Sequence, residues 1–196
     1  MLDTQTLQSL QTLWEEGEAH DQLCSVHAQR WRMITPDTGR FLYQLVRASG
    51  ARRVVEIGTA SGFSTVWLAL AVRANQGRVT SVDFSADMQA AAIEHLHAFG
   101  VESQVTLECY DAGQWLKALE ASPVDFLFLD ADRTRYCDLW LQICRVLRPG
   151  GLVVMDNALS HAAECEPFIE QVLQTPGYLA QTYQIGKGQF VILKDE

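Results

Sequence analysis

The chain has 196 residues, of which 48% are hydrophobic and 20% are charged, and its formal net charge is -9. This length and apolar content predict a single domain with a sizeable core. Nucleic acids and anionic membranes bind clustered Lys and Arg, so the acidic balance argues against both as partners. It favours a cation, a cationic cofactor or a neutral small molecule instead.

Three features of the sequence favour a cytoplasmic protein. The five cysteines are an odd, scattered set without metal-ligand spacing, which is typical of reduced thiols. The first residues lack the basic and apolar segments of a signal peptide. No apolar run approaches the ~18 residues that a membrane helix requires.

The amino-terminal region is expected to be helical. Leucines and a tryptophan recur at helical spacing and predict an amphipathic helix over 4–17, followed by a second helix over 20–29. A third helix is expected over 36–49, with Thr35 as its N-cap and Pro36 in its first turn. The apolar surface of these helices favours a homodimer.

From Arg52 onward, strands and helices alternate, which predicts a doubly wound α/β sheet with helices on both faces. The expected strands are 53–57, 78–83, 104–109, 124–130, 151–156, 178–185 and 189–194. The expected helices are 62–74, 86–99, 113–120, 134–147 and 161–174. Gly186-Lys187-Gly188 is a hairpin-like turn, so a mostly parallel sheet of seven strands would close with an antiparallel pair. No repeat or linker divides the chain, so 1–196 is expected to be one domain, with 1–35 as a helical cover over its functional site.

A glycine-containing turn follows the first expected strand. Gly58 and Gly62 would let a ligand approach the backbone, and the helix after them presents free N–H groups. A dinucleotide-binding loop shows G-x-G-x-x-G spacing, whereas here three residues separate the glycines and Glu56 precedes the first. The turn therefore suits a ligand with amino and cationic groups better than a pyrophosphate. Any tight turn from strand to helix remains the simpler alternative.

Asp83 ends the second expected strand. An acid at this place in a Rossmann-like fold hydrogen-bonds ribose hydroxyls, so together with the glycine turn it indicates an adenosine-type ligand. Tyr110-Asp111-Ala112 follows the third strand, where it could border the adenine. A simple helix cap by Asp111 would explain the same residues equally well.

Oxygen-bearing side chains end two expected neighbouring strands. Asp130 ends the expected strand 124–130, and Asp156 ends 151–156 with Asn157 directly after it, so a right-handed crossover would bring all three to one sheet edge. Such hard oxygen ligands suit Mg²⁺, Mn²⁺ or Ca²⁺ and disfavour zinc. Alternatively, each residue could cap a helix or simply end its strand.

At this point the sequence resembles the cation-dependent O-methyltransferase family that includes catechol and caffeoyl-coenzyme A O-methyltransferases. The resemblance runs from about Trp31 to Lys194. It rests on Met33-Ile34-Thr35-Pro36, on Glu56 to Ser64, on Asp130-Ala131-Asp132, on Tyr136, on Leu147-Arg148-Pro149-Gly150-Gly151 and on Asp156-Asn157. It implies a Rossmann-like methyltransferase sheet and direct methyl transfer to a hydroxyl of a small, catechol-like acceptor.

The resemblance also implies which residues bind ligands. S-adenosylmethionine would contact a set at the carboxyl ends of the first strands: Met33, Glu56, Gly58, Ser64, Asp83, Asp111, Ala112 and Asp130. A divalent cation, most simply Mg²⁺, would be held by Asp130, Asp156 and Asn157. Trp31 stands where catechol-type members place an aromatic wall beside the acceptor, or it packs the amino-terminal helices.

One departure from the family pattern concerns the catalytic base. The family's D-x-x-K-x-x-Y pattern has Arg133 at the place of its lysine. A guanidinium stays protonated at working pH, so Arg133 could stabilise an oxyanion but not take a proton. His161 is the alternative base, although a histidine at a helix start is more often a cap or surface residue. Asp130 would contribute through the cation.

Three rival interpretations remain open. The chain could methylate another acceptor without a metal, with Asp130 and Asp156 binding the substrate by hydrogen bonds. It could be a nicotinamide-dependent dehydrogenase, although the G-x-G-x-x-G motif is missing. It could also be a binding protein that has kept the pocket but lost the reaction.

Overall fold

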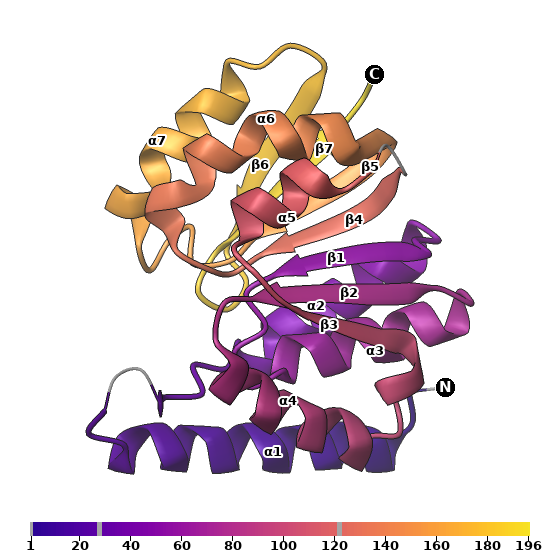
Figure 1. Cartoon of the computed structure of the whole chain (residues 1–196), viewed down its shortest axis with the longest axis vertical. Coiled ribbons are helices and arrows are strands. Elements are labelled where there is room, and N and C mark those ends of the chain that lie inside the picture. The colour runs from indigo at the N-terminus through magenta and orange to yellow at the C-terminus, as the bar shows by residue number, and fades with distance from the viewer. Residues whose placement is uncertain (1, 27–28, 121–122) are drawn as a thin grey trace.

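The computed structural model describes residues 2–26, 29–120 and 123–196, which form one seven-stranded sheet with helices on both faces (Figure 1). The strand order is β3-β2-β1-β4-β5-β7-β6. The strands are β1 (Arg53–Ile57), β2 (Arg78–Asp83), β3 (Val105–Cys109), β4 (Val124–Leu129), β5 (Leu147–Met155), β6 (Tyr178–Tyr183) and β7 (Gln189–Lys194). The first five strands pair in parallel and β7 is antiparallel to β5 and β6, which confirms the predicted topology.

Helices divide between the two faces of the sheet. They are α1 (Thr4–Leu23), α2 (Pro36–Ala48), α3 (Phe63–Ala74), α4 (Ala86–Ala98), α5 (Ala112–Ala118), α6 (Tyr136–Val146) and α7 (Ala162–Leu173), with short 3₁₀ turns η2 (Glu102–Gln104) and η3 (Arg133–Arg135). One core joins the sheet to α2, α3, α4 and α1, and a second joins it to α5, α6 and α7.

The central strand β4 has a near-continuous apolar sequence because both of its faces are covered. In β4, Phe126 and Phe128 lie in the first core, whereas Leu127 and Leu129 lie in the second. Successive side chains of a strand point to opposite faces, so a strand between two helical layers needs apolar residues at every position. Helix α3 is buried from Phe63 to Val72 because it lies inside the first of these layers.

The amino-terminal helices differ from the prediction. One helix, α1, covers most of the two expected segments, and residues 24–26 are not helical. Residues 27–28 of the expected helix 20–29 lie outside the described part of the chain. Gly17 does not interrupt α1, because its missing side chain makes room for Met33: a Cβ there would lie 2.6 Å from the Met33 sulfur. Thr35 caps α2 as predicted, accepting the Thr38 N–H at 3.2 Å.

Two other element boundaries differ from the prediction. Strand β5 begins at Leu147, four residues earlier than expected, and its register with β4 shifts between Val124 and Phe126. The expected helix 134–147 begins with the 3₁₀ turn η3, so α6 itself starts at Tyr136.

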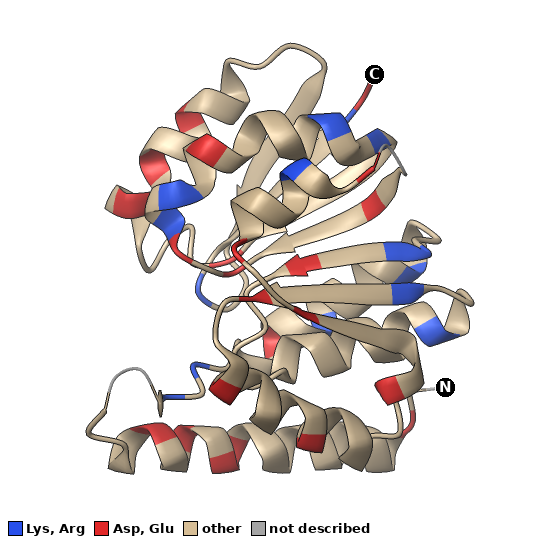
Figure 2. Ribbon diagram, in the orientation of Figure 1, with Lys and Arg blue, Asp and Glu red and all other residues tan. Residues whose placement is uncertain are grey.

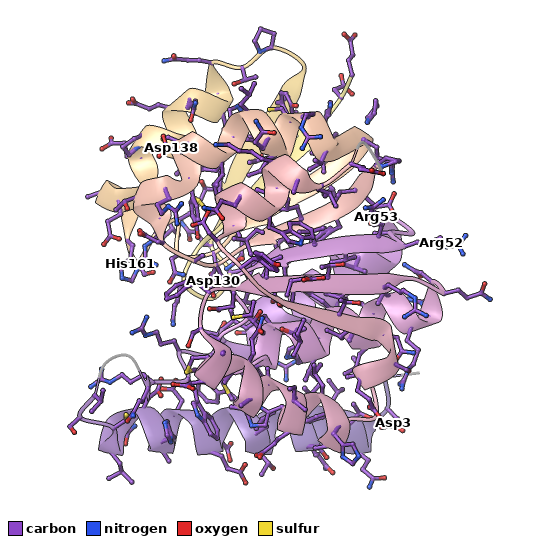
Figure 3. All side chains as sticks on the ribbon, viewed as in Figure 1. Asp3, Arg52, Arg53, Asp130, Asp138 and His161 are labelled. Atoms are coloured by element: carbon purple, nitrogen blue, oxygen red, sulfur yellow. The ribbon has the colours of Figure 1, made fainter. Side chains whose placement is uncertain are left out.

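The parallel strands place their carboxyl ends together at one edge of the sheet. Figure 3 shows Asp130 and His161 at this end and Arg52 and Arg53 at the other. Figure 2 shows basic residues where β1 and β2 begin, and acidic residues where they end. Within the described ranges, no helix is both long and apolar enough to cross a bilayer. All five cysteines are free.

Candidate active site

Glu56 lies fully buried near the end of β1. Its Oε2 accepts hydrogen bonds from Thr65 Oγ1 and Ser81 Oγ, both at 2.5 Å. Burial raises the pKa of Glu56 to about 7, and the neighbouring hydroxyls, including that of Ser64, oppose the rise. Its Oε1 is buried without a partner among the described residues. An unpartnered buried oxygen of this kind can accept a hydrogen bond from a ligand.

Gly58 brings the end of β1 against the segment after β4. Its φ is +105°, and a Cβ there would lie 2.1 Å from the Asp130 carbonyl oxygen. Only glycine combines this backbone conformation with such a close approach. Gly62, also in the left-handed region, is the N-cap of α3. The glycine turn therefore lies directly beside Asp130.

Asp83 fixes the far side of the glycine turn. One carboxylate oxygen accepts the Ala60 N–H at 2.9 Å and the other accepts the Ser85 N–H at 2.9 Å. A carboxylate oxygen has two acceptor sites, so each can still bind a ligand hydroxyl. The Tyr110 N–H donates to the Asp83 carbonyl at 2.9 Å, which brings the third strand's end to the same place.

Asp111 caps a helix, as the simpler interpretation had it. Its Oδ1 accepts the Gln114 N–H at 3.0 Å, and α5 begins with Ala112. Its Oδ2 pairs with Arg135 Nη1 at 2.7 Å, and this hydrogen bond, more than the helix contact, lowers the pKa of Asp111. The cap leaves Tyr110 exposed beside Asp83.

Asp130 and Asp156 follow the neighbouring strands β4 and β5, as predicted. Asn157 Nδ2 donates to Asp130 Oδ1 at 2.9 Å, and Asn157 itself has φ +68°. Gln189 Nε2, from the start of β7, donates to Asp156 Oδ1. The three predicted ligands therefore converge at one edge of the sheet.

The electrostatics of this acid pair favour a cation. Burial raises the pKa of Asp130 to about 8, and the charge of Asp156 adds to the rise. Burial likewise raises the pKa of Asp156. Neither carboxylate forms an ion pair with a Lys or Arg within the described ranges. Two unneutralised carboxylates close together are unfavourable when buried, and a divalent cation would relieve the repulsion.

The donor set fits a hard cation. Two carboxylates and the amide oxygen of Asn157 are the oxygen ligands that Mg²⁺, Mn²⁺ and Ca²⁺ prefer. Among the described residues, no group of three or more His, Cys, Asp or Glu side chains gathers where it could hold a metal. A cation here would therefore depend on the amide, and on water or a ligand, for its remaining contacts.

Arg133 does not stand free at the site. Its Nε pairs with Glu164 of α7 at 2.9 Å, and the side chain is partly buried. The preceding loop is fixed by Tyr136, whose buried hydroxyl accepts the Ala131 N–H at 2.7 Å. The guanidinium charge is therefore already matched by a carboxylate.

His161 occupies the N-cap position of α7 without a side-chain capping bond. Its Nδ1 lies 3.0 Å from Ser160 Oγ, which donates to Asn157 Oδ1 at 3.2 Å. A chain of side-chain hydrogen bonds therefore runs from His161 through Ser160 to Asn157 and Asp130. Figure 3 shows His161 and Asp130 at the same end of the sheet.

Trp31, on the segment that follows α1, packs between His20 of α1 and His95 of α4. Its ring stacks on His20 with centroids 4.5 Å apart and meets His95 edge-on at 5.0 Å. Its carbonyl accepts a bond from Ser61 Oγ at 3.3 Å, so this segment lies against the glycine turn. Met33, farther along, is buried against Gly17.

Sequence reasoning missed several polar residues of this site. Each hydrogen-bonds to a predicted residue, and all but Ser160 do so from a different helix or strand: Thr65, Ser81, Ser160, Glu164 and Gln189. Gln189 is a polar residue at the start of an otherwise apolar strand, which is the one signal that could have revealed it.

The fold and the position of the site define the class of protein. It is a Rossmann-like α/β protein with a glycine turn and an acid pair at the carboxyl edge of its sheet. A solved O-methyltransferase structure from Klebsiella pneumoniae, itself named putative, matches with a TM-score of 0.82 and 27% identity, covering 95% of this chain and 90% of the other. A cofactor-bound protein from MTB matches with a TM-score of 0.81 and 25% identity, covering 96% and 90%. The fold is therefore that of the Rossmann-like O-methyltransferases.

The family is shown by a direct sequence match. The model of the O-methyltransferase family matches residues 13–178, so the chain belongs to this family. It is 33% identical over 129 residues to a catechol O-methyltransferase of Niastella koreensis, a match that covers 64% of this chain and 58% of the relative. A probable caffeoyl-CoA O-methyltransferase of Dictyostelium discoideum is 30% identical over 151 residues, covering 74% and 65%. The chain thus spans somewhat less than two thirds of these relatives.

Proposed function

We propose that this chain transfers a methyl group from S-adenosylmethionine to a hydroxyl of a small acceptor with adjacent oxygens, such as a catechol, and uses a divalent cation. Family membership supports the reaction class, and the two curated relatives support this type of acceptor. The observation that carries the proposal is the pair Asp130 and Asp156, which lacks a basic partner in the described structure and lies beside the glycine turn.

The methyl donor would bind along the carboxyl ends of β1, β2 and β3. The free Oε1 of Glu56 can accept from its amino group, and Gly58 allows close approach to the backbone. Asp83 can accept from ribose hydroxyls. The exposed side chains of Phe84 and Tyr110 offer apolar surface for the adenine. Met33, Ser64, Asp111, Ala112 and Asp130 complete the proposed set.

Asp130, Asp156 and Asn157 would hold the cation. When bound, a divalent cation supplies Lewis acidity that lowers the pKa of an acceptor hydroxyl. The chain contributes the orientation of the ligands: Gln189 fixes Asp156, and Ser160 fixes the Asn157 amide. Mg²⁺ is the ion we expect, and Mn²⁺ or Ca²⁺ would suit the same oxygens.

His161 is the proposed acceptor of the hydroxyl proton. Its Nδ1 is hydrogen-bonded to Ser160, whose hydroxyl donates to Asn157, so the imidazole is held near the acid pair and its Nε2 would be the nitrogen that accepts the proton. Arg133 cannot accept a proton. Through its ion pair with Glu164 it would instead hold α7 against the loop after β4.

Alignment would supply much of the remaining catalysis. The cationic sulfonium of the donor and the oxyanion of the acceptor react to give a neutral thioether and a neutral methyl ether, so a site that orders both reactants and excludes water lowers the barrier. The segment through Trp31 lies against the glycine turn, is stacked on His20 of α1, and would cover the methyl donor. We propose residues 1–35 as this cover.

The test is a panel of catechols and other hydroxylated acceptors with radiolabelled S-adenosylmethionine, run with Mg²⁺ and with excess EDTA. We expect labelled product from vicinal diols with Mg²⁺ and its loss with EDTA. No labelled product from any acceptor, with or without the metal, would contradict the proposal.

A second candidate is methylation without a metal. It is favoured by the hydrogen bonds that Asn157 and Gln189 already donate to Asp130 and Asp156, because these partly satisfy the carboxylates without a cation. The EDTA arm separates the two candidates: undiminished turnover in excess chelator selects the second.

A further inference from the structure

The turn between β6 and β7 lies at the same sheet edge as the acid pair. The first residues of β7 pair with the last residues of β5, so the turn before β7 faces the segment after β5. Backbone bonds join the two: the Gly188 carbonyl accepts the Ala158 N–H at 3.0 Å, and the Lys187 carbonyl accepts from Leu159 at 3.2 Å and Ser160 at 3.0 Å. Lys187 is therefore fixed beside the residues that follow Asn157.

The two glycines around Lys187 allow the turn to pack tightly on both sides. A Cβ on Gly186 would lie 2.5 Å from Thr35 Oγ1, and one on Gly188 would lie 2.5 Å from the Leu159 nitrogen. Both have positive φ, +56° and +95°. Neither position accepts a side chain without rearrangement, so Lys187 is the exposed side chain that this turn presents at its tip.

The amine of Lys187 has no hydrogen-bond or ion-pair partner among the described residues, whereas Lys194, at the far end of β7, and Arg133 both have partners. None of the hydrogen bonds or ion pairs among the described residues involves its Nζ. Lys194 differs, because its Nζ donates to the carbonyls of Cys144 and Leu147 at 2.8 and 2.9 Å. The charge of Arg133 is matched by Glu164.

The field of Lys187 reaches both acids. Burial and the charge of Asp156 raise the pKa of Asp130, and the positive charge of Lys187 opposes that rise. Burial raises the pKa of Asp156, and Lys187 opposes this rise as well. Arg133 acts in the same direction on both, and Glu56 acts against it on Asp130.

We propose that the Lys187 ammonium contacts the acceptor oxygen that receives the methyl group and stabilises its ionised form. The inference rests on the proposed function. An acceptor oxyanion beside Asp130, Asp156 and Glu56 needs positive charge, and Lys187 is the basic side chain that the turn makes available for it. The proposal makes Lys187 a catalytic residue from a part of the chain far from the glycine turn.

The proton and electron balance of the transfer is simple. The acceptor hydroxyl loses its proton to His161 and then to water. An electron pair of the resulting oxyanion forms the bond to the methyl carbon while the carbon–sulfur bond breaks, and the sulfur leaves as a neutral thioether. Lys187 gives up no proton in this transfer and acts by its charge and hydrogen bond.

The test uses Lys187→Met, Lys187→Arg and the matched control Lys117→Met, since Lys117 is an exposed lysine on α5. The probe is 4-nitrocatechol, whose absorbance changes on ionisation, bound with Mg²⁺ and S-adenosylhomocysteine. The measured quantity is the pH at which the bound probe ionises. We expect Lys187→Met to raise it by about 1–2 pH units, Lys187→Arg to stay near the wild type, and Lys117→Met to match it.

A second readout needs no acceptor. Removing a positive charge near the acid pair should tighten binding of Mn²⁺ alone about threefold or more in Lys187→Met but not in Lys117→Met. An unchanged ionisation midpoint in Lys187→Met would overturn the role of Lys187 while leaving methyl transfer by the wild type intact. Failure of the wild type to bind the probe or to methylate any catechol would overturn the proposed function, and this inference with it.

Discussion

The buried carboxyl group of Glu56 should make the stability of the ligand-free protein depend on pH. Its pKa is raised from 4.5 to about 7 in the folded chain, chiefly by burial. Folding therefore favours the protonated form, so the stability that this group contributes is fully present below pH 4.5 and is lost as the pH rises toward 7. At about 1.4 kcal/mol for each pKa unit, the full loss amounts to about 3 kcal/mol.

Glu56→Gln isolates this contribution. The amide oxygen can replace Oε2 as the acceptor for Thr65 and Ser81, and the NH₂ group takes the place of Oε1, which has no partner in the described structure. The new buried donor costs about 1–3 kcal/mol at every pH, but the side chain no longer titrates. The stability difference between wild type and variant should therefore change with pH by about 3 kcal/mol, in favour of the variant at higher pH.

The assay is urea unfolding of the ligand-free proteins from pH ~5 to ~8, analysed as the difference between the two curves. Asp130 and Asp156 also have raised pKa values, but both proteins retain them, so their contribution largely cancels. Glu18→Gln, on the exposed side of α1, is the control and should give a curve close to the wild type. Parallel curves for Glu56→Gln and wild type would refute the reasoning.

Three further outcomes follow from the site. Gly58→Ala would place a Cβ 2.1 Å from the Asp130 carbonyl oxygen at φ +105°, and it should lower the free energy of unfolding by more than about 3 kcal/mol. The control Gly50→Ala, at a position with no neighbouring atom within 4 Å, should lower it by about 1 kcal/mol. Equal losses for the two variants in urea unfolding would contradict this prediction. Asp156→Asn should reduce methyl transfer at least about 100-fold while calorimetry still detects S-adenosylmethionine binding; full activity would refute its role. Glu164→Ala should cost under about 1 kcal/mol in thermal unfolding because its ion pair with Arg133 is partly exposed, and a larger loss would mean the pair is structural.

The centre of the sheet was predictable from the sequence because β4 and the second half of β5 are almost continuously apolar. The runs that end at Asp130 and Asp156 fix both the parallel pairing of β4 and β5 and the edge at which their acids emerge. The glycine turn was also predictable, because Gly58 and Gly62 both adopt the positive φ that favours glycine. Local chemistry determined these features, so a local pattern could reveal them.

Contacts across long sequence separations were not predictable in the same way. The partner of Arg133 is Glu164, on a different helix, and the partner of Asp156 is Gln189, on the third element after β5. Neither Glu164 nor Gln189 belongs to a motif, and which of many polar residues meets Arg133 or Asp156 depends on the assembled fold. Two helices were predicted where the structure has the single helix α1, which continues through Gly17. The missing side chain of Gly17 leaves room for Met33, a contact that exists only in the folded protein and that no local pattern reveals.

The position of β7 links the site to the order in which the chain folds. This final strand enters between β5 and β6, and its first residue, Gln189, is the one that holds Asp156. Gln189 reaches Asp156 only when β7 has paired with β5, and that pairing has a loop-closure entropy cost that a helix does not have. Helical signal should then recover before affinity for Mn²⁺ does when the denatured protein is diluted into buffer, which makes cation affinity a reporter of sheet assembly.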